Sequence, residues 1–145
     1  MIRGAVRADC DALLLLIRQH ADFERAQATI DRGMLGSLIT EAEPEVRLYV
    51  AEGKRTLHGF AAMTIDFSLW RGHHWGHLDC LFVSSEARGL GVGAALLEHV
   101  RSAAASLGLD RLEWQTPRWN QRAIEFYRRE GAESEEKMRF ALSVR

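Results

Sequence analysis

The segment SEARGLGVGAALLEHV, residues 85–100, constrains the fold of this chain more than any other. Glycine stands at positions 89, 91 and 93, and an apolar pattern at helical spacing follows. A glycine-rich turn before an amphipathic helix would explain part of this pattern, but three glycines at alternate positions exceed what a turn needs. Glycine permits close backbone approach, and a helix N-terminus offers free N–H groups to an anion. We therefore predict a phosphate-binding loop, with Arg88 adding charge at its entrance.

Three phosphate-bearing ligands are candidates for this loop. The spacing Gly89-x-Gly91-x-x-Ala94 matches a dinucleotide fingerprint, and Glu113 follows at about the distance where an acid would bind a ribose. That fingerprint needs its first glycine directly after a strand, whereas SSEAR separates Val83 from Gly89. A triphosphate loop would end in Gly-Lys-Ser or Gly-Lys-Thr, which is absent. Coenzyme A remains, because its pyrophosphate needs glycines and a helix N-terminus.

The hydrophobic pattern predicts an α/β fold with a mixed sheet. The expected order is strand, two helices, three strands, helix, strand, helix, strand. Asp9, Thr29 and Asn120 are candidate helix N-caps, and Gly108 is a natural helix stop. The strands are expected at 2–6, 46–52, 57–68, 75–83, 111–116 and 138–144, and the helices at 11–24, 30–39, 93–108 and 121–131.

Composition excludes several classes of protein. The 145 residues suit one domain, residues 1–145, and a net charge of −1 gives no electrostatic footprint for nucleic acid or a membrane surface. No apolar run approaches the roughly 20 residues of a membrane span. The charged start does not read as a signal peptide, and two cysteines far apart, Cys10 and Cys80, favour a reducing compartment. We expect a cytoplasmic protein.

Two blocks of this chain resemble a known family. VSSEARGLGVGAALL is similar to the signature of the GNAT N-acetyltransferases, with Arg88, Gly91 and Gly93 at its defining positions. WNQRAIEFYRREGA resembles the later motif of that family, and one helix and one strand fit between the two blocks. The matching positions of this later block are Asn120, Ala123, Phe126, Tyr127 and Gly131.

A finer resemblance points to the diamine acetyltransferase branch, which includes spermidine/spermine and thialysine enzymes. LDCLFV and HADFE carry it together with the later block. This branch has two adjacent acids before the LFV-like stretch, but this chain has Asp79 and Cys80 there. The loss of the second acid argues against a polycationic substrate.

The resemblance implies a single domain whose mostly antiparallel sheet opens to a V where the cofactor lies. It implies direct attack of a primary amine of a small molecule on acetyl-CoA in a ternary complex, and a homodimer. In the family a strand such as Leu81–Val83 bulges and pairs with the pantetheine arm. The positions expected to bind coenzyme A are Leu81, Phe82, Val83, Arg88, Gly89, Leu90, Gly91, Val92, Gly93, Ala94, Asn120, Ala123 and Tyr127.

Two residues are the catalytic candidates. Tyr127 would protonate or hold the departing thiolate, although an aromatic of the core is the commoner fate of a tyrosine. Asp79 would act as the base through a water, or would only bind the cation of the substrate; Glu113 in the neighbouring strand is a rival base. Backbone N–H groups would stabilise the carbonyl oxygen.

The acceptor site is less well defined. Asp22 and Glu24 would attract an ammonium group, or would be a solvated helix end. Trp70, Trp75 and Trp119 would wall the acceptor site, form a subunit contact or pack in the core. A buried core residue is the preferred interpretation of Cys80 over a ping-pong nucleophile. His73 and His77 share a strand face without His74 or a completing ligand, so we predict no metal site.

Three other functions remain open. A protein or peptide N-acetyltransferase needs an open groove, which the bulky segment DFSLWRGHHWGH would narrow. A coenzyme A sensor without turnover needs neither Tyr127 nor Asp79, and both are present. A nucleotide-binding module would bind NAD or ATP instead of acetyl-CoA.

Overall fold

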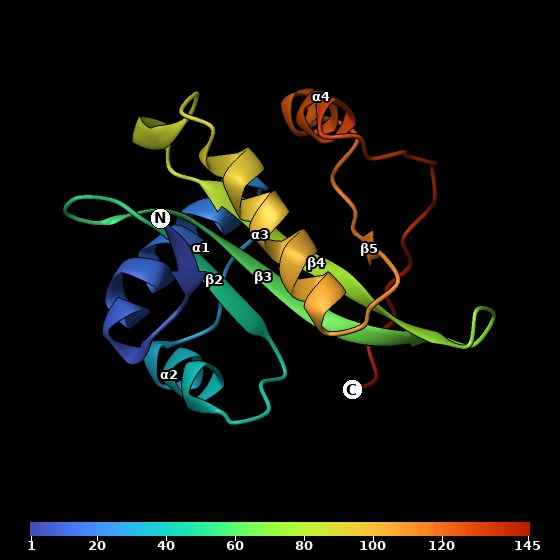
Figure 1. Ribbon diagram of the computed structural model, residues 1–145, viewed down its shortest axis with the longest axis horizontal. Coiled ribbons are helices and arrows are strands. Elements are labelled where there is room, and N and C mark those ends of the chain that lie inside the picture. Colours follow the sequence, from blue (N-terminus) through green and yellow to red (C-terminus); the bar gives the residue numbers. More distant parts are fainter. The chain divides into compact units, whose positions relative to one another are not determined.

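The computed structural model describes residues 1–145, which form two compact units, residues 1–115 and 116–145. Figure 1 shows their elements, and each unit is described by itself. The second unit contains one helix, α4 (Gln121–Arg129). The first contains β1 (Ile2–Gly4), α1 (Cys10–Phe23), α2 (Arg32–Thr40), β2 (Arg47–Glu52), β3 (Leu57–Ser68), β4 (His73–Val83), α3 (Val92–Ser106) and β5 (Leu112–Glu113), with 3₁₀ turns at Arg7–Asp9 and Ser85–Ala87.

The first unit is built on a five-stranded mixed sheet in the order β1-β2-β3-β4-β5. β1 to β4 are antiparallel neighbours, and β5 runs parallel to β4, so the predicted mixed sheet is confirmed. One face carries α1 and α2, whose leucines pack with Val50, Phe60 and Phe82. α3 packs on the opposite face, where Leu96 lies against Gly59 (Figure 1). None of the helices has the length and apolar character that a membrane crossing requires.

The edge of β4 becomes free beyond its midpoint. β4 and β5 pair only at Gly76↔Leu112 and His77↔Glu113, whereas β4 continues to Val83. On its other side, the register with β3 shifts between Ala62 and Met63, which leaves Asp79 as a bulged residue. Beyond His77, the edge of β4 that faces away from β3 therefore has no paired strand.

The helix starts required two corrections. Asp9 precedes α1 as expected, but its carboxylate accepts hydrogen bonds from Val6 N at 2.8 Å and from the Arg3 guanidinium, and it does not cap α1. Thr29 does not begin α2. Asp31 caps that helix by accepting from Met34 N at 2.8 Å, because its carboxylate is a stronger acceptor and stands directly before the first turn.

The predicted strand at 138–144 is wrong. This segment has no regular secondary structure, and its alternating side chains Met138, Phe140, Leu142 and Val144 are exposed. The second unit contains no other strand, and a strand needs a partner for its backbone N–H and C=O groups. Alternation alone therefore could not produce a strand here. The strand expected at 111–116 also shortens to the two residues of β5.

Candidate active site

The predicted phosphate loop has the backbone that its glycines require. Gly89 and Gly91 both have φ of +79°, a region that L side chains rarely adopt. Gly91 is the N-cap of α3, no side chain caps this helix, and its first turn contains no acid. A Cβ at either glycine would meet no atom within 4 Å. The backbone at these two glycines is therefore open to close approach, and the N-terminus of α3 follows directly, which fits a pyrophosphate.

Arg88 makes contacts that the sequence did not predict. Its Nε donates to the carbonyl of Val83 at 3.3 Å. Its guanidinium carbon lies 5.5 Å from the ring centroid of Phe23 on α1 and 5.8 Å from that of Phe82 on β4. These cation–π contacts connect the end of α1 with the end of β4. Arg88 therefore joins the phosphate loop to the face of the sheet that carries α1.

β4 offers the backbone positions expected to bind a pantetheine arm. Leu81, Phe82 and Val83 pair with β3 on one side. No strand of the sheet pairs with them on the other side, because β5 ends at Glu113. Unpaired strand edges accept an additional extended segment through main-chain hydrogen bonds. The edge at these three residues is therefore available to an extended ligand, and their role in binding one stays a prediction.

The bulge in β4 brings Asp79 and Cys80 together. The Cys80 thiol donates to the Asp79 carboxylate, with Sγ 3.7 Å from Oδ2. Burial, the neighbouring Asp79 carboxylate and the charge of Glu24 together raise the pKa of this thiol to about 12. The Cys80 side chain therefore stays a neutral thiol near pH 7, which opposes its use as a nucleophile. Asp79 itself is exposed to solvent.

The end of α1 adds a histidine that sequence reasoning missed. His20 Nε2 lies 2.7 Å from Glu24 Oε2, one helical turn away. The His20 ring stacks on Phe82 with centroids 5.3 Å apart and meets Phe60 edge-on at 6.0 Å. The i, i+4 spacing of His and Glu could have indicated the pair. We call the following residues the acceptor cluster: His20, Glu24, Asp79, Cys80, Phe82 and Arg88.

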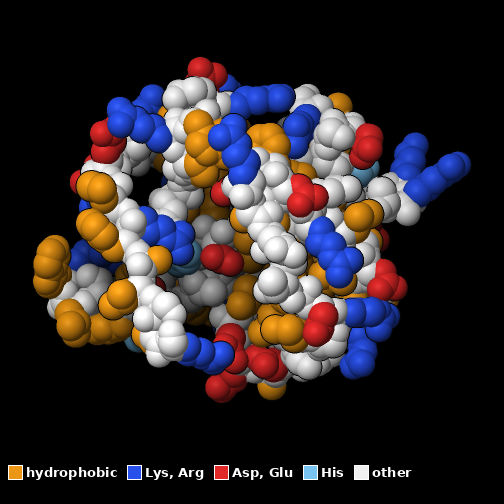
Figure 2. Space-filling view, turned by 180° about the vertical axis from the view of Figure 1, so that it is seen from behind, with side chains coloured by type: hydrophobic (Ala, Val, Ile, Leu, Met, Phe, Trp, Pro, Cys, Tyr) orange, Lys and Arg blue, Asp and Glu red, His pale blue; other side chains and the backbone are white.

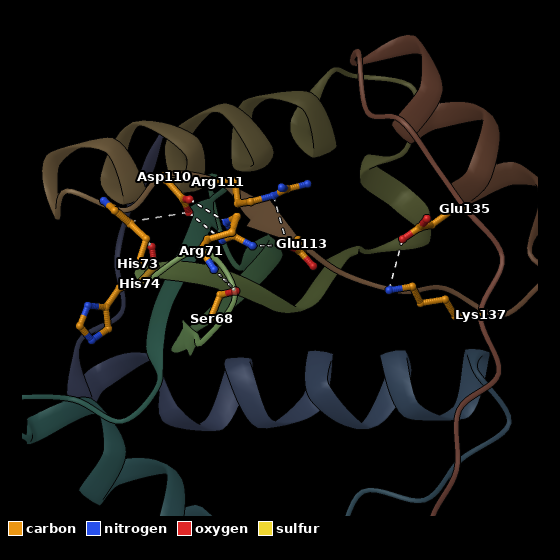
Figure 3. A network of polar contacts seen from close by, with 9 residues as sticks. All are labelled: Ser68, Arg71, His73, His74, Asp110, Arg111, Glu113, Glu135 and Lys137. Atoms are coloured by element: carbon orange, nitrogen blue, oxygen red, sulfur yellow. Dashed lines mark hydrogen bonds and ion pairs between the residues drawn. The ribbon is translucent and has the colours of Figure 1, made fainter.

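Asp22 and Glu113 lie outside the acceptor cluster. Asp22 is exposed and stands two residues from His20 and from Glu24, a spacing that turns it to another side of the helix. Glu113 is held by Arg111 at 3.1 Å and by Arg71 at 3.6 Å (Figure 3). These ion pairs engage the Glu113 carboxylate in a network apart from the acceptor cluster, which weakens the case for Glu113 as a base.

The same network joins the β3–β4 hairpin to the strand that follows α3. Arg71 forms two hydrogen bonds of 3.0 Å to Asp110, which lower the pKa of that carboxyl group (Figure 3). His73 lies at the edge of this network, with its Nδ1 3.9 Å from the Asp110 carboxylate. This histidine also bonds the carbonyl of His74. These contacts are structural in character.

The hairpin tip places Trp70 away from the acceptor cluster. Its side chain is 101% exposed, which removes core packing as an interpretation. From His73 to Asp79 the strand spans six residues, roughly 20 Å. Phe67 and Leu69 are exposed beside Trp70, and Figure 2 shows apolar side chains projecting at the left edge, where this hairpin ends.

The remaining histidine and tryptophan of β4 face their neighbours in the sheet. His77 Nδ1 lies 3.4 Å from the Thr64 hydroxyl, and its ring is 6.2 Å from that of Trp75. His74 packs edge-on against Phe67 at 4.9 Å. No group of three or more His, Cys, Asp or Glu side chains is arranged to hold a metal ion.

The second unit carries the other candidate residues. Asn120 caps α4 as predicted, because its side-chain oxygen accepts from Ala123 N at 3.3 Å. The ring of Tyr127 lies 5.3 Å from that of Phe126 in a tilted pair. Gly131 has φ of +93°, so the helix ends where its glycine predicts. Trp119, just before the cap, is 41% exposed.

Comparisons with known proteins agree with this architecture. The model of the Acetyltransferase (GNAT) family matches residues 14–132. The chain is 29% identical over 143 residues to Thialysine N-epsilon-acetyltransferase of Bos taurus, covering 92% of this chain and 84% of the relative. It is 33% identical over 100 residues to a Peptidyl-lysine N-acetyltransferase of Escherichia coli (strain K12), covering 69% and 58%. The structure of an aminoglycoside acetyltransferase from a soil metagenomic sample superimposes with a TM-score of 0.83 at 18% identity, covering 100% and 96%.

Proposed function

Because this chain belongs to the Acetyltransferase (GNAT) family, we propose that it transfers the acetyl group of acetyl-CoA to a primary amine of a small molecule. Family membership makes the chain an acetyl-CoA-dependent N-acetyltransferase. The acceptor we propose is a diamine, a polyamine or a lysine-like amine, and the thialysine relative supports this choice. We treat residues 1–145 as one catalytic domain, because the family match runs across the division between the two units.

The observation that carries the proposal is the pairing of an open phosphate loop with a free strand edge. Acetyl-CoA would supply the acetyl thioester, with its pyrophosphate at residues 88–94 and its pantetheine arm along Leu81–Val83. The positive φ of Gly89 and Gly91 and the empty space at their missing side chains support the first contact. By resemblance, Asn120, Ala123 and Tyr127 would complete the site.

The proposed chemistry is direct attack in a ternary complex. The amine nitrogen forms a bond to the acetyl carbonyl carbon, and the carbon–sulfur bond breaks. Asp79 would take the proton of the ammonium through a water, supported by its exposed position on the bulge next to a neutral Cys80. Backbone N–H groups of β4 would stabilise the carbonyl oxygen. Tyr127 would donate a proton to the departing thiolate.

The acceptor would bind in front of the acceptor cluster. Glu24 and Asp79 would attract the cationic group of the acceptor. Both carboxylates raise the pKa of the Cys80 thiol, which supports the proposal that they lie near each other. The homodimer implied by the resemblance is also proposed, with Trp70 and Leu69 of the exposed hairpin tip as a subunit contact. Free thiols at Cys10 and Cys80 support a reducing, cytoplasmic location.

One alternative has its own support. The Escherichia coli relative is a peptidyl-lysine acetyltransferase, so a lysine side chain of a peptide is the second candidate acceptor.

The decisive experiment measures thiol release from acetyl-CoA across a panel of amines. The panel contains putrescine, spermidine, thialysine, lysine, an aminoglycoside and a lysine-containing peptide. We expect turnover with a diamine or thialysine. Turnover with the peptide alone would favour the alternative. Silence with every amine, while calorimetry still detects acetyl-CoA binding, would support a sensor.

Two variants test the assigned roles. Tyr127→Phe should lower kcat by about a hundredfold, the scale of a lost general acid. Asp79→Asn should remove the acid limb of the pH–rate profile. Glu98→Gln, an exposed change on α3, serves as the control and should keep both values. Unchanged kcat in Tyr127→Phe would refute the assignment of that residue.

A further inference from the structure

His20 occupies a position that none of the proposed catalytic steps uses. Its side chain is only 15% exposed, yet its Nε2 lies 2.7 Å from a carboxylate oxygen of Glu24. The ring packs between Phe82 and Phe60, which come from β4 and β3. A histidine stacked on one aromatic ring and in edge contact with another has few rotamers available, so it fixes the group to which it is bonded.

The group fixed by His20 is Glu24, the carboxylate that α1 brings to the acceptor cluster. The negative charge of Glu24 helps to raise the pKa of the Cys80 thiol. The sulfur of this thiol lies 3.7 Å from the Asp79 carboxylate. Since Cys80 is neutral, β4 contributes one negative charge, and Glu24 supplies a second from α1. Two carboxylates whose charges both act on this neutral thiol suit an acceptor with two cationic groups.

The charge of this arrangement depends on the protonation of His20. A neutral imidazole donates a hydrogen bond and leaves Glu24 a full negative charge. An imidazolium ion forms an ion pair with Glu24, and the net charge of the pair is then zero. Besides Glu24 on its own helix, the Arg88 guanidinium lies over the same Phe82 ring as His20. On β4, the titratable pair Cys80 and Asp79 stands two or three residues before Phe82, and β3 meets the ring through Phe60.

We propose that His20 is a positioning residue that holds Glu24 in the acceptor site and, by its protonation, sets how strongly the site binds a second cationic group. This inference rests on the proposed transfer to a small amine, and it narrows the acceptor to a dication. Binding of such an acceptor strengthens as the pH rises and His20 becomes neutral. Acceptors with one cationic group respond less, because Asp79 alone can serve them.

The test compares 1,4-diaminobutane with butylamine from pH 6.0 to 8.5. Both amines stay largely protonated over this range, so their own charge changes little. Initial rates of thiol release from acetyl-CoA give KM and kcat for each amine. We expect the KM of the diamine to fall about fivefold across the range, the scale of one partly exposed ion pair, with a smaller change for butylamine.

Three variants separate positioning from charge. His20→Gln keeps a donor toward Glu24 but cannot ionise, so the diamine KM should lose its pH dependence. His20→Leu removes the hydrogen bond and should raise the diamine KM at every pH. Glu24→Gln should raise the diamine KM and remove its pH dependence. His99→Gln removes a histidine on the α3 face, where its ring meets Tyr49, and should keep the wild-type profile.

The outcomes are distinct for the two levels of the proposal. A diamine KM in His20→Gln that follows the wild-type pH profile overturns the role of His20 while leaving the transferase assignment intact. Equal pH dependence for both amines overturns the second cationic group. No turnover of either amine by the unaltered protein refutes the small-amine acceptor and this inference with it. Thermal unfolding of each variant verifies that it is folded.

Discussion

A single methyl group at Gly59 should separate the two strands that carry the candidate site. A Cβ there would lie 2.5 Å from the carbonyl oxygen of Phe82, 3.2 Å from Leu96 Cδ1 and 3.3 Å from Val83 Cα. The nearest atom is backbone, so a side-chain rotation cannot relieve the clash. Overpacking of this kind costs about 1–3 kcal/mol, and a loss of about 2 kcal/mol lowers the Tm of a chain this size by roughly 6–8 °C.

Gly4→Ala is the matched control for Gly59→Ala. Gly4 also lies in a strand, but a Cβ there meets no atom within 4 Å. Reduced entropy of the unfolded chain should make this variant neutral, or more stable by up to about 1 kcal/mol. Urea unfolding with an unchanged m-value measures both free energies. Gly59→Ala should also weaken coenzyme A binding, because it displaces the Phe82 carbonyl. Equal stability of the two variants would refute the reasoning.

Three further predictions concern single groups. Because the pKa of the Cys80 thiol is about 12 instead of 9.0, its thiolate fraction at pH 8 is about a thousandfold smaller than in the unfolded chain. Iodoacetamide should therefore label Cys80 far more slowly in the folded protein, and Asp79→Asn should speed this labelling. Equal labelling rates in folded and unfolded protein would contradict this. The Arg3 guanidinium holds the pKa of Asp9 below 3.8, so about 1–2 kcal/mol of stability is present at neutral pH and lost as the pH falls through that region. Asp9→Asn should lack this acid-side loss in urea titrations at pH 6 and pH 3, and a parallel decline would count against the pair. Trp70→Ser should leave the unfolding free energy within about 0.5 kcal/mol but convert a dimer to monomers in sedimentation, whereas a persistent dimer would exclude this contact.

Local patterns predicted most of the first unit. The bounds of β3, residues 57–68, match the predicted strand, because alternation and flanking turns define a strand that has partners on both sides. The stop of α3 is confirmed by the φ of +75° at Gly108. The segment 138–144 has the same alternation as a strand, but no partner accepts its backbone groups. The alternation of apolar residues shows which segments can form a strand, but a segment forms one only when a neighbouring strand pairs with its backbone.

The candidate site divides along the same line. The loop conformation at Gly89 and Gly91 could be predicted, because a backbone with positive φ before a helix favours glycine in the sequence. The contacts of Arg88 with two phenylalanines could not, because they join residues far apart in the chain. His20 was missed for the same reason: its bond to Glu24 is local, but its importance depends on Phe82 and Phe60.

Cys80 shows how the structure changes the meaning of a sequence departure. From the sequence, a cysteine in place of an acid argued against a polycationic acceptor. In the fold, burial keeps this thiol neutral, and the charge of Glu24 reaches it from α1. The negative charge missing from β4 is therefore available from the neighbouring helix, at a residue held by His20. Acceptor selectivity would then depend on α1 as well as on β4, and the strand motif alone would be a poor guide to the substrate.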